Sequence, residues 1–138
     1  MAGLSIFDIA GSGMNAQNLR LNLVASNISN ANSVASSAAE VYKSRQPVFA
    51  AELDKAMNTQ NATSKVNVLG VVESQDAPVM EYAPHHPMAN SDGYIFKSNV
   101  NTVEEMANMM SASRSYQNNI EVLNTAKQMM LQTLKMGQ

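Results

Sequence analysis

The chain contains no cysteine in its 138 residues. Without cysteine there is neither a disulfide framework nor a thiolate metal site, so two common ways of stabilising a small domain are excluded. This composition fits a reducing cytosol, and it fits equally well an exported protein that dispenses with disulfides.

Charged residues are also scarce, at 14% of the chain against about 25% in typical soluble domains. In their place stand 16 asparagines and 8 glutamines, whose carboxamides form hydrogen bonds without the desolvation cost of an ion. Such a surface suits coverage by another protein, although a compositional drift in one organism would give the same totals. The net charge of −2 and the scattered Lys and Arg argue against nucleic-acid binding.

Signals for a membrane or a secretory route are missing. The first residues lack the basic and apolar segments of a leader peptide, and Ala2 stands where N-myristoylation requires glycine. No window approaches the roughly 20 apolar residues of a membrane-spanning helix. The sequence therefore predicts no membrane insertion and leaves the compartment open.

The N-terminal region shows helical periodicity. Residues 5–32 contain no proline and no run of β-branched residues, and large apolar residues recur there every seventh position. This pattern predicts a helix that packs along its length against another helix. The seam positions are Phe7, Met14, Leu21 and Ile28, followed three residues later by Ala10, Gln17, Val24 and Ala31.

A second helix is predicted for residues 102–136. Thr102 and Glu105 offer a capping box at its start, and Gly137 stands where a C-cap glycine belongs. A second apolar stripe beside the seam indicates more than one neighbour. The seam positions are Met106, Met109, Ser113, Tyr116, Ile120, Leu123, Lys127, Met130 and Leu134. The second stripe is Val103, Met110, Val122, Met129 and Met136.

The middle of the chain has the composition of strands and turns instead of long helices. Residues 66–72 are rich in valine, residues 79–82 and 94–96 are short strand candidates, and Asp92-Gly93 predicts a turn. Residues 55–65 predict an exposed, flexible loop. The predicted fold is mainly α with a small β insertion. Its expected parts are an N-terminal helix within 1–34, a β-rich insertion within 35–99 and a C-terminal helix within 100–138.

No catalytic, metal or cofactor site is predicted. Gly11-Ser12-Gly13 lacks the spacing of a nucleophile elbow and the lysine of a phosphate loop. His85 and His86 are adjacent and flanked by prolines, so they fit a turn better than a metal site. A Ser/His/Asp triad can be formed by residues that are far apart in the sequence, but no sequence feature indicates an activated serine. We therefore expect a protein that is not an enzyme.

Two glycines within the first predicted helix need an explanation, because each costs about 1 kcal/mol relative to alanine. Close approach of a neighbouring helix at Gly11 and Gly13 is the favoured explanation. The alternative is a kink without a function.

Both ends of the chain resemble the bacterial flagellar rod and hook proteins. At the N-terminal end the resemblance rests on IFDIAGSG at 6–13, Gln17, LRLN at 19–22 and VASNISNANSV at 24–34. At the C-terminal end it rests on MMSASRSYQ at 109–117 and IEVLNTAK at 120–127. Shorter matches lie at 72–74, 87–89 and Gly93-Tyr94.

This resemblance implies a structural subunit of the basal-body proximal rod that polymerises helically and transmits motor torque. It implies an antiparallel coiled coil of the two terminal helices, export through the flagellar apparatus without a cleaved signal, and a place in the periplasmic rod. The implied partners are other copies of the chain, other proximal and distal rod proteins, the adaptor at the rod base and the export apparatus. Catalysis and cofactors are not part of the family's role.

The helix residues give a predicted assembly interface. We expect the polar, uncharged end of the first helix to satisfy helix-end carbonyls and neighbouring backbones where a charge would be costly; the alternative is a solvated helix cap. The predicted interface residues are Phe7, Met14, Leu21, Val24, Asn27, Ile28, Asn30, Asn32, Met106, Met109, Tyr116, Ile120, Leu123, Met130 and Leu134.

Two further expectations follow from the helices. With two apolar faces and few charges they have little to stabilise them alone, so we expect the isolated subunit to have mobile ends that become ordered on assembly. The alternative function is a self-contained coiled-coil adaptor in the cytosol, which the heptads fit equally well.

Overall fold

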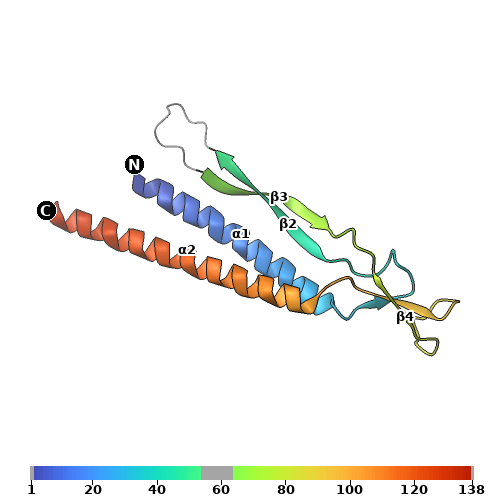
Figure 1. The fold of residues 1–138 in the computed structure, drawn as a ribbon. Coiled ribbons are helices and arrows are strands. Elements are labelled where there is room, and N and C mark those ends of the chain that lie inside the picture. The colour runs from blue at the N-terminus through green and yellow to red at the C-terminus, as the bar shows by residue number, and fades with distance from the viewer. Residues whose placement is uncertain (1, 54–63, 138) are drawn as a thin grey trace.

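Two long antiparallel helices, α1 (Ala2–Asn30) and α2 (Thr102–Met136), dominate the chain. The computed structural model describes residues 2–53 and 64–137. Figure 1 shows both chain ends at one end of an elongated molecule, with the connecting β segments starting from the other end. The strands are β1 (Val34–Ala35), β2 (Arg45–Leu53), β3 (Ser64–Glu73), β4 (Val79–Tyr82) and β5 (Tyr94–Lys97).

The first helix ends in the asparagine-rich stretch, close to where the sequence predicts. Its residues contain no proline to interrupt the hydrogen-bond ladder. At its end the Asn30 side-chain Nδ2 donates to the carbonyl of Ser26 at 2.8 Å, and the amide of Ala31 donates to the carbonyl of Ile28 at 3.2 Å. The last turn therefore satisfies part of its free carbonyls by itself.

The second helix has the predicted bounds but a different N-cap. Asn101 is the N-cap residue, and its side-chain oxygen accepts from the amides of Val103 at 3.1 Å and Glu104 at 3.4 Å. The predicted capping box of Thr102 and Glu105 is wrong, because Thr102 already lies inside the helix. Gly137 is the C-cap residue as predicted, with φ −92°, so it does not use the left-handed conformation.

The middle region contains a long antiparallel hairpin of β2 and β3. The valine-rich strand prediction is confirmed by β3, but β2 was not predicted as a strand and contains Pro47. A two-stranded ribbon tolerates proline because each strand has an unpaired edge. The predicted loop at 55–65 is wrong for Ser64 and Lys65, which belong to β3; its residues 55–63 lie outside the described part of the chain.

The hairpin lies along α1, as Figure 1 shows. Two contacts tie β3 to this helix: Lys65 Nζ lies 3.7 Å from Asp8 Oδ2, and the amide of Val66 donates to Ser12 Oγ at 3.2 Å. Both pairs are exposed, so they position the hairpin more than they stabilise it.

A three-stranded antiparallel sheet with the order β1-β5-β4 lies beyond the hairpin. The predicted turn before β5 is confirmed, since Gly93 has φ +81°. A Cβ at this position would also lie 2.9 Å from the Tyr82 ring, so both the backbone and the packing require glycine. His85 and His86 lie in the turn region between β4 and β5, as predicted.

The buried core is thin and made mainly of small side chains. The observed class, two long helices with a small antiparallel β region in the middle, agrees with the predicted mainly α fold. An elongated subunit of this kind has few positions far from solvent, so much of its apolar surface stays exposed. The buried apolar residues are Ala10, Ala16, Val24, Ala35, Val41, Ile95 and Ala112.

Candidate assembly surfaces

The two helices approach each other through small residues. Ala16 is 2% exposed on α1, and Ala112 is 0% exposed on α2. A Cβ added at Gly13 would lie 3.0 Å from Asn119 Nδ2 of α2, which is tighter than ordinary van der Waals contact. This close approach confirms the packing explanation for Gly13.

The same explanation does not hold for Gly11 within the subunit. Among the described residues, no atom outside its own stretch of helix lies within 4 Å of a Cβ added at this position. In this part of the chain, no close contact therefore offsets the conformational cost of this second helix glycine.

The inward face of α2 differs from the predicted seam at alternate positions. Met109, Tyr116 and Leu123 are half-buried, as a seam residue should be. Between them the inward positions are small or polar, and each lies one residue before a predicted seam position. These positions are Glu105, Ala112, Asn119 and Ala126. Four large residues of the predicted seam are exposed: Met106, Ile120, Met130 and Leu134.

Close packing explains this shift. Ala16 of α1 and Ala112 of α2 are almost fully buried, so a longer side chain would have no room at either position. The bulky residues therefore turn outward. The heptad pattern predicted these bulky residues on the inward face because it reflects residue size and polarity but not the distance between the two helices.

The predicted interface residues of α1 divide by exposure. Val24 is buried, and four apolar residues of the seam are half-buried and keep part of their surface in solvent. These four are Phe7, Met14, Leu21 and Ile28.

Asn27 is the largest fully buried side chain of the described residues, at 1% exposure. Its Nδ2 donates to the carbonyl of Arg45 at 2.9 Å and to Ser44 Oγ at 3.3 Å. Its Oδ1 accepts from the Tyr42 hydroxyl at 2.8 Å and the amide of Arg45 at 3.0 Å. The polar group that we placed at a subunit contact is thus fully used inside this chain, where it joins α1 to the start of β2.

The neighbouring asparagines are placed differently. Asn30 is half-buried and binds the carbonyl of Ser26, so it caps its own helix. Asn32 is exposed in the turn that follows. Of the three asparagines, only Asn32 presents its whole side chain to the surroundings of the subunit.

The sequence reasoning missed the partners of this polar junction. Tyr42 also lies 3.2 Å from Ser26 Oγ, Arg20 donates to Asn108 Oδ1 at 3.0 Å, and Asn99 Oδ1 accepts from the amide of Ser44 at 2.8 Å. The two residues of each pair are 16, 88 and 55 residues apart in the sequence, respectively, so no periodic pattern relates them. The asparagine-rich end of the first helix and the resemblance of residues 24–34 to rod proteins pointed to this region, but not to these partners.

Large apolar side chains on α2 form an exposed surface along nearly the whole helix. Met110 is 59% exposed, and Met129, nineteen residues later, is 63% exposed. Exposed apolar patches of this extent mark interaction sites more often than solvent-facing surface. We call this set the α2 apolar surface: Val103, Met106, Met110, Ile120, Val122, Met129, Met130, Leu131, Leu134 and Met136.

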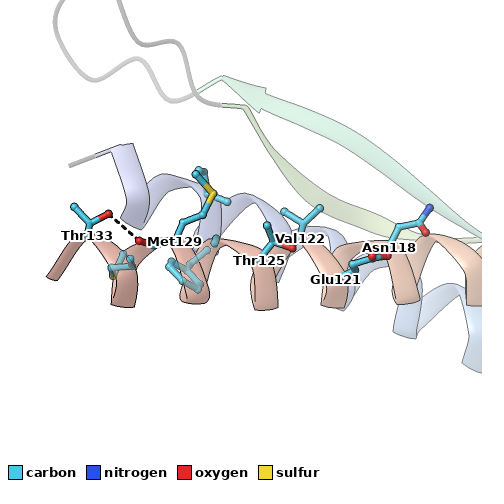
Figure 2. Close-up of a pocket in the computed structure, with 10 residues that line it drawn as sticks. Asn118, Glu121, Val122, Thr125, Met129 and Thr133 are labelled. Carbon is cyan, nitrogen blue, oxygen red and sulfur yellow. Dashed lines mark hydrogen bonds between the residues drawn. The ribbon is translucent and has the colours of Figure 1, made fainter. Parts of the chain in front are cut away.

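A groove of about 730 Å³ continues this surface between the helices, near the chain ends. Ile6 and Phe7 of α1 line it together with the C-terminal half of α2. Figure 2 shows Val122, Thr125 and Met129 along this half, with Thr133 Oγ1 donating to the carbonyl of Met129 at 2.7 Å. The exposed lining is mainly apolar, with Asn118, Glu121, Thr125 and Thr133 also contributing to it, so the groove suits a mainly apolar side chain or helix.

The described residues show no arrangement that would hold a metal ion. Within 2–53 and 64–137, no group of three or more His, Asp or Glu side chains is close enough to bind one. His86 Nδ1 instead accepts from the amide of Met88 at 3.1 Å, which stabilises the turn. None of the described helices combines the length and apolar character that a membrane crossing needs.

Two family models match the chain, and they fall on the two helices. The model described as "Flagella basal body rod protein" matches residues 7–35, and "Flagellar basal body rod FlgEFG protein C-terminal" matches residues 91–136. Together they cover most of α1 and all of α2.

Curated relatives match over the whole length. The flagellar basal-body rod protein FlgC of Salmonella typhimurium is 51% identical over 138 residues, covering 100% of both chains. The FlgC of Escherichia coli O157:H7 is 50% identical over 138 residues with the same coverage. The FlgC of Agrobacterium fabrum is 36% identical over 127 residues, or 91% of this chain and 88% of the relative.

Proposed function

This chain belongs to the FlgC family of flagellar basal-body rod proteins, and on that premise we propose that it polymerises helically in the proximal rod and transmits motor torque. It is a structural subunit of the rod and assembles with other rod or basal-body proteins. The finer statements below concern how this subunit is built for that role.

The α2 apolar surface carries the proposal. A monomer in water would expose ten large apolar side chains on one helix, from Val103 to Met136, in a chain that is only 14% charged. Burial of apolar surface is the main favourable term in protein association. Neighbouring subunits that pack on α2 would remove this surface from water.

The assembly interface extends to α1 through the groove near the chain ends. Phe7 of α1 and Met130 of α2 both line this groove. A helix of an adjacent subunit would fill the groove, while Met14, Leu21 and Ile28 would contribute the half-buried part of the contact. Asn32 completes the surface at the turn, whereas Asn27 acts within the subunit.

The helix pair itself is proposed to pack as an antiparallel coiled coil. On the inward face of α2, half-buried Met109, Tyr116 and Leu123 recur every seven residues, as in a heptad repeat. Val24 of α1 is buried and supplies one apolar seam position of the other helix. The close contact at Gly13 supports a pair that is tightly packed at its centre.

The proposed partners follow from the family likeness. They are other copies of the chain, the other proximal and distal rod proteins, the adaptor at the rod base and, during secretion, the flagellar export apparatus. We propose that the subunit is exported without a cleaved signal and takes its place in the periplasmic part of the basal body.

The isolated subunit is proposed to have mobile helix ends that become ordered in the rod. Ile6 and Ile9 near the start of α1, and the last turns of α2 from Met129 to Met136, are largely exposed. Helices gain most of their stability from packing, so these ends lack their main stabilising contacts in a monomer. Amide exchange on the purified subunit tests this, and strong protection throughout residues 5–32 would contradict it.

Cell fractionation tests the function itself. A tagged chain that restores motility to a deletion strain should appear in purified hook-basal bodies. The cytosolic coiled-coil adaptor, which the FlgC relatives do not favour, would instead leave the protein in the soluble fraction.

A further inference from the structure

A second, more polar pocket lies where α1, the first turns of α2 and β2 meet. Its volume is about 330 Å³. Val24, Pro47 and Phe49 give it an apolar wall, and Arg20, Glu104 and Glu105 bring charges to it. It lies at the opposite end of the helix pair from the apolar groove.

Glu105 is the unusual member of this pocket. The residue is 4% exposed, and its Oε2 is buried without a hydrogen-bond partner. A buried carboxylate is costly unless a donor or a cation lies against it. Among the residues that the structure describes, this oxygen therefore has no donor.

The two cations that line the pocket are engaged elsewhere. The Arg20 guanidinium donates to Asn108 Oδ1 at 3.0 Å, and Arg45 pairs with Glu73 at 3.1 Å. Within the described ranges 2–53 and 64–137, no Lys, Arg or His nitrogen lies within 4.0 Å of a Glu105 carboxylate oxygen. A cation from outside the subunit, or a rearranged Arg20, would satisfy this oxygen.

The chemistry of the pocket fits an arginine side chain. The apolar wall suits the aliphatic stem of such a residue, and the unpartnered carboxylate suits its head. Arginine is favoured over lysine at buried ion pairs because its guanidinium is more weakly hydrated and offers several fixed donors. Exposed Glu104 beside the pocket adds a second negative charge that attracts a cation.

Arg114 of α2 is a donor with the right placement. It is exposed, and no ion pair or hydrogen bond involves it among the residues described by the structure. It follows Glu105 by nine residues (114 − 105), which at about 100° per residue places the two on opposite sides of α2. A donor and an acceptor on opposite sides cannot meet within one chain, but they can meet between successive copies.

We propose that the Glu105 pocket receives Arg114 of a second copy of this chain, in an ion pair that joins adjacent subunits head to tail. Contacts between different faces of identical subunits generate open helical arrays instead of closed dimers. The proposal rests on the proposed rod function and adds a specific contact to it.

Cysteine cross-linking tests this contact, because the natural chain contains no cysteine to compete. Exposed Glu104, on the edge of the pocket, and exposed Gln117, one turn beyond Arg114 on the same side of α2, are each changed to cysteine (Glu104→Cys and Gln117→Cys), so that Glu105 and Arg114 are both kept. The two variants are expressed together, and a short bismaleimide should then give cross-linked dimers in purified hook-basal bodies. The matched control replaces Gln117→Cys by Lys127→Cys, an exposed position on another side of α2, and should give none.

Charge-removing variants test the same contact without cysteine. Arg114→Gln and Glu105→Gln should each lower the number of assembled basal bodies by about tenfold or more, and the double variant should lower it no further. Lys127→Gln should have no effect. If Arg20→Gln reproduces the loss and Arg114→Gln does not, Glu105 pairs with Arg20 inside the subunit and the proposal is overturned.

The two proposals fail in different ways. If the unaltered chain is absent from hook-basal bodies, the rod function itself is wrong. If the chain is present but Gln117→Cys cross-links to Glu104→Cys no better than Lys127→Cys does, only the head-to-tail contact is wrong.

Discussion

The polar junction around Asn27 and the α2 apolar surface differ in what a single chain can complete. At the junction, both ends of the Asn27 carboxamide find partners within the subunit, and its side chain is 1% exposed. On the α2 apolar surface, large side chains such as Met110 and Met129 are 59% and 63% exposed.

This contrast distinguishes two roles of residues in the same helix pair: some stabilise the subunit, and others are available for contacts with neighbouring subunits. The uncharged polar residues at the end of α1 build the subunit, because they fix the chain where it leaves the helix for β2. The exposed apolar residues of α2 have no such role in the subunit. Substitutions at the two places should therefore affect different measurements.

The largest expected effect is on assembly. Met110→Lys combined with Met129→Lys should abolish swimming and basal-body formation, since each charge would be buried unpaired in the proposed subunit contact. The free energy of unfolding of the monomer should change by no more than about 0.5 kcal/mol, as for other surface substitutions. Basal-body counts by electron microscopy and denaturant unfolding measure the two quantities.

The control for this pair is Gln128→Lys, an exposed change on the same helix outside the α2 apolar surface. It should leave assembly unchanged. A motile strain carrying both methionine substitutions would show that this surface faces solvent in the rod.

A substitution at the polar junction around Asn27 should instead lower the stability of the monomer. Asn27→Leu leaves the buried backbone of Arg45 and the Tyr42 hydroxyl without their partner, so the free energy of unfolding should fall by about 2–4 kcal/mol. Denaturant unfolding of the purified monomer measures the loss. Asn22→Leu, an exposed asparagine on the same helix, serves as the matched control and should be near neutral; equal losses would mean that the junction is not a stabilising element.

A smaller effect is expected where the helices are closest. Gly13→Val should cost about 1–3 kcal/mol more than Gly11→Val, because its side chain would push against Asn119 whereas the space at Gly11 is open. Thermal unfolding of the two monomers compares them directly. If the two variants unfold alike, the close helix contact does not form in solution.

The smallest expected effect is at the helix end. Asn30→Lys removes the hydrogen bond to the carbonyl of Ser26 and should lower the monomer's stability by about 0.5–1.5 kcal/mol. If Asn30 also meets a neighbouring subunit, motility should fall by more than this loss explains. Unchanged motility and rod assembly would identify Asn30 as a simple helix cap.

The sequence predicted where the helices and strands lie better than which side of each helix faces its partner. Heptad spacing located α1 and α2, and valine and tyrosine content located β3 to β5. The inward face of α2 was misplaced, because periodicity favours large residues while buried inward positions such as Ala112 have no room for them. β2 was missed, since Pro47 lowers any strand score although a ribbon edge accepts it.

The polar sites were the least predictable part. The asparagine-rich stretch indicated an unusual helix end, but the choice of Tyr42 and Arg45 as partners of Asn27 depends on how the chain folds back after the turn. The unpartnered oxygen of Glu105 likewise appears only when α1, α2 and β2 are packed together.

Solvent accessibility of α2 in the rod tests the central claim most directly. A single cysteine introduced as Val122→Cys, in the apolar groove, can be labelled with a water-soluble maleimide in the monomer and in purified hook-basal bodies. The account predicts fast labelling of the monomer and strong protection in the basal body. Equal labelling in both would contradict it, because the apolar surface of α2 would then be open to water in the finished rod.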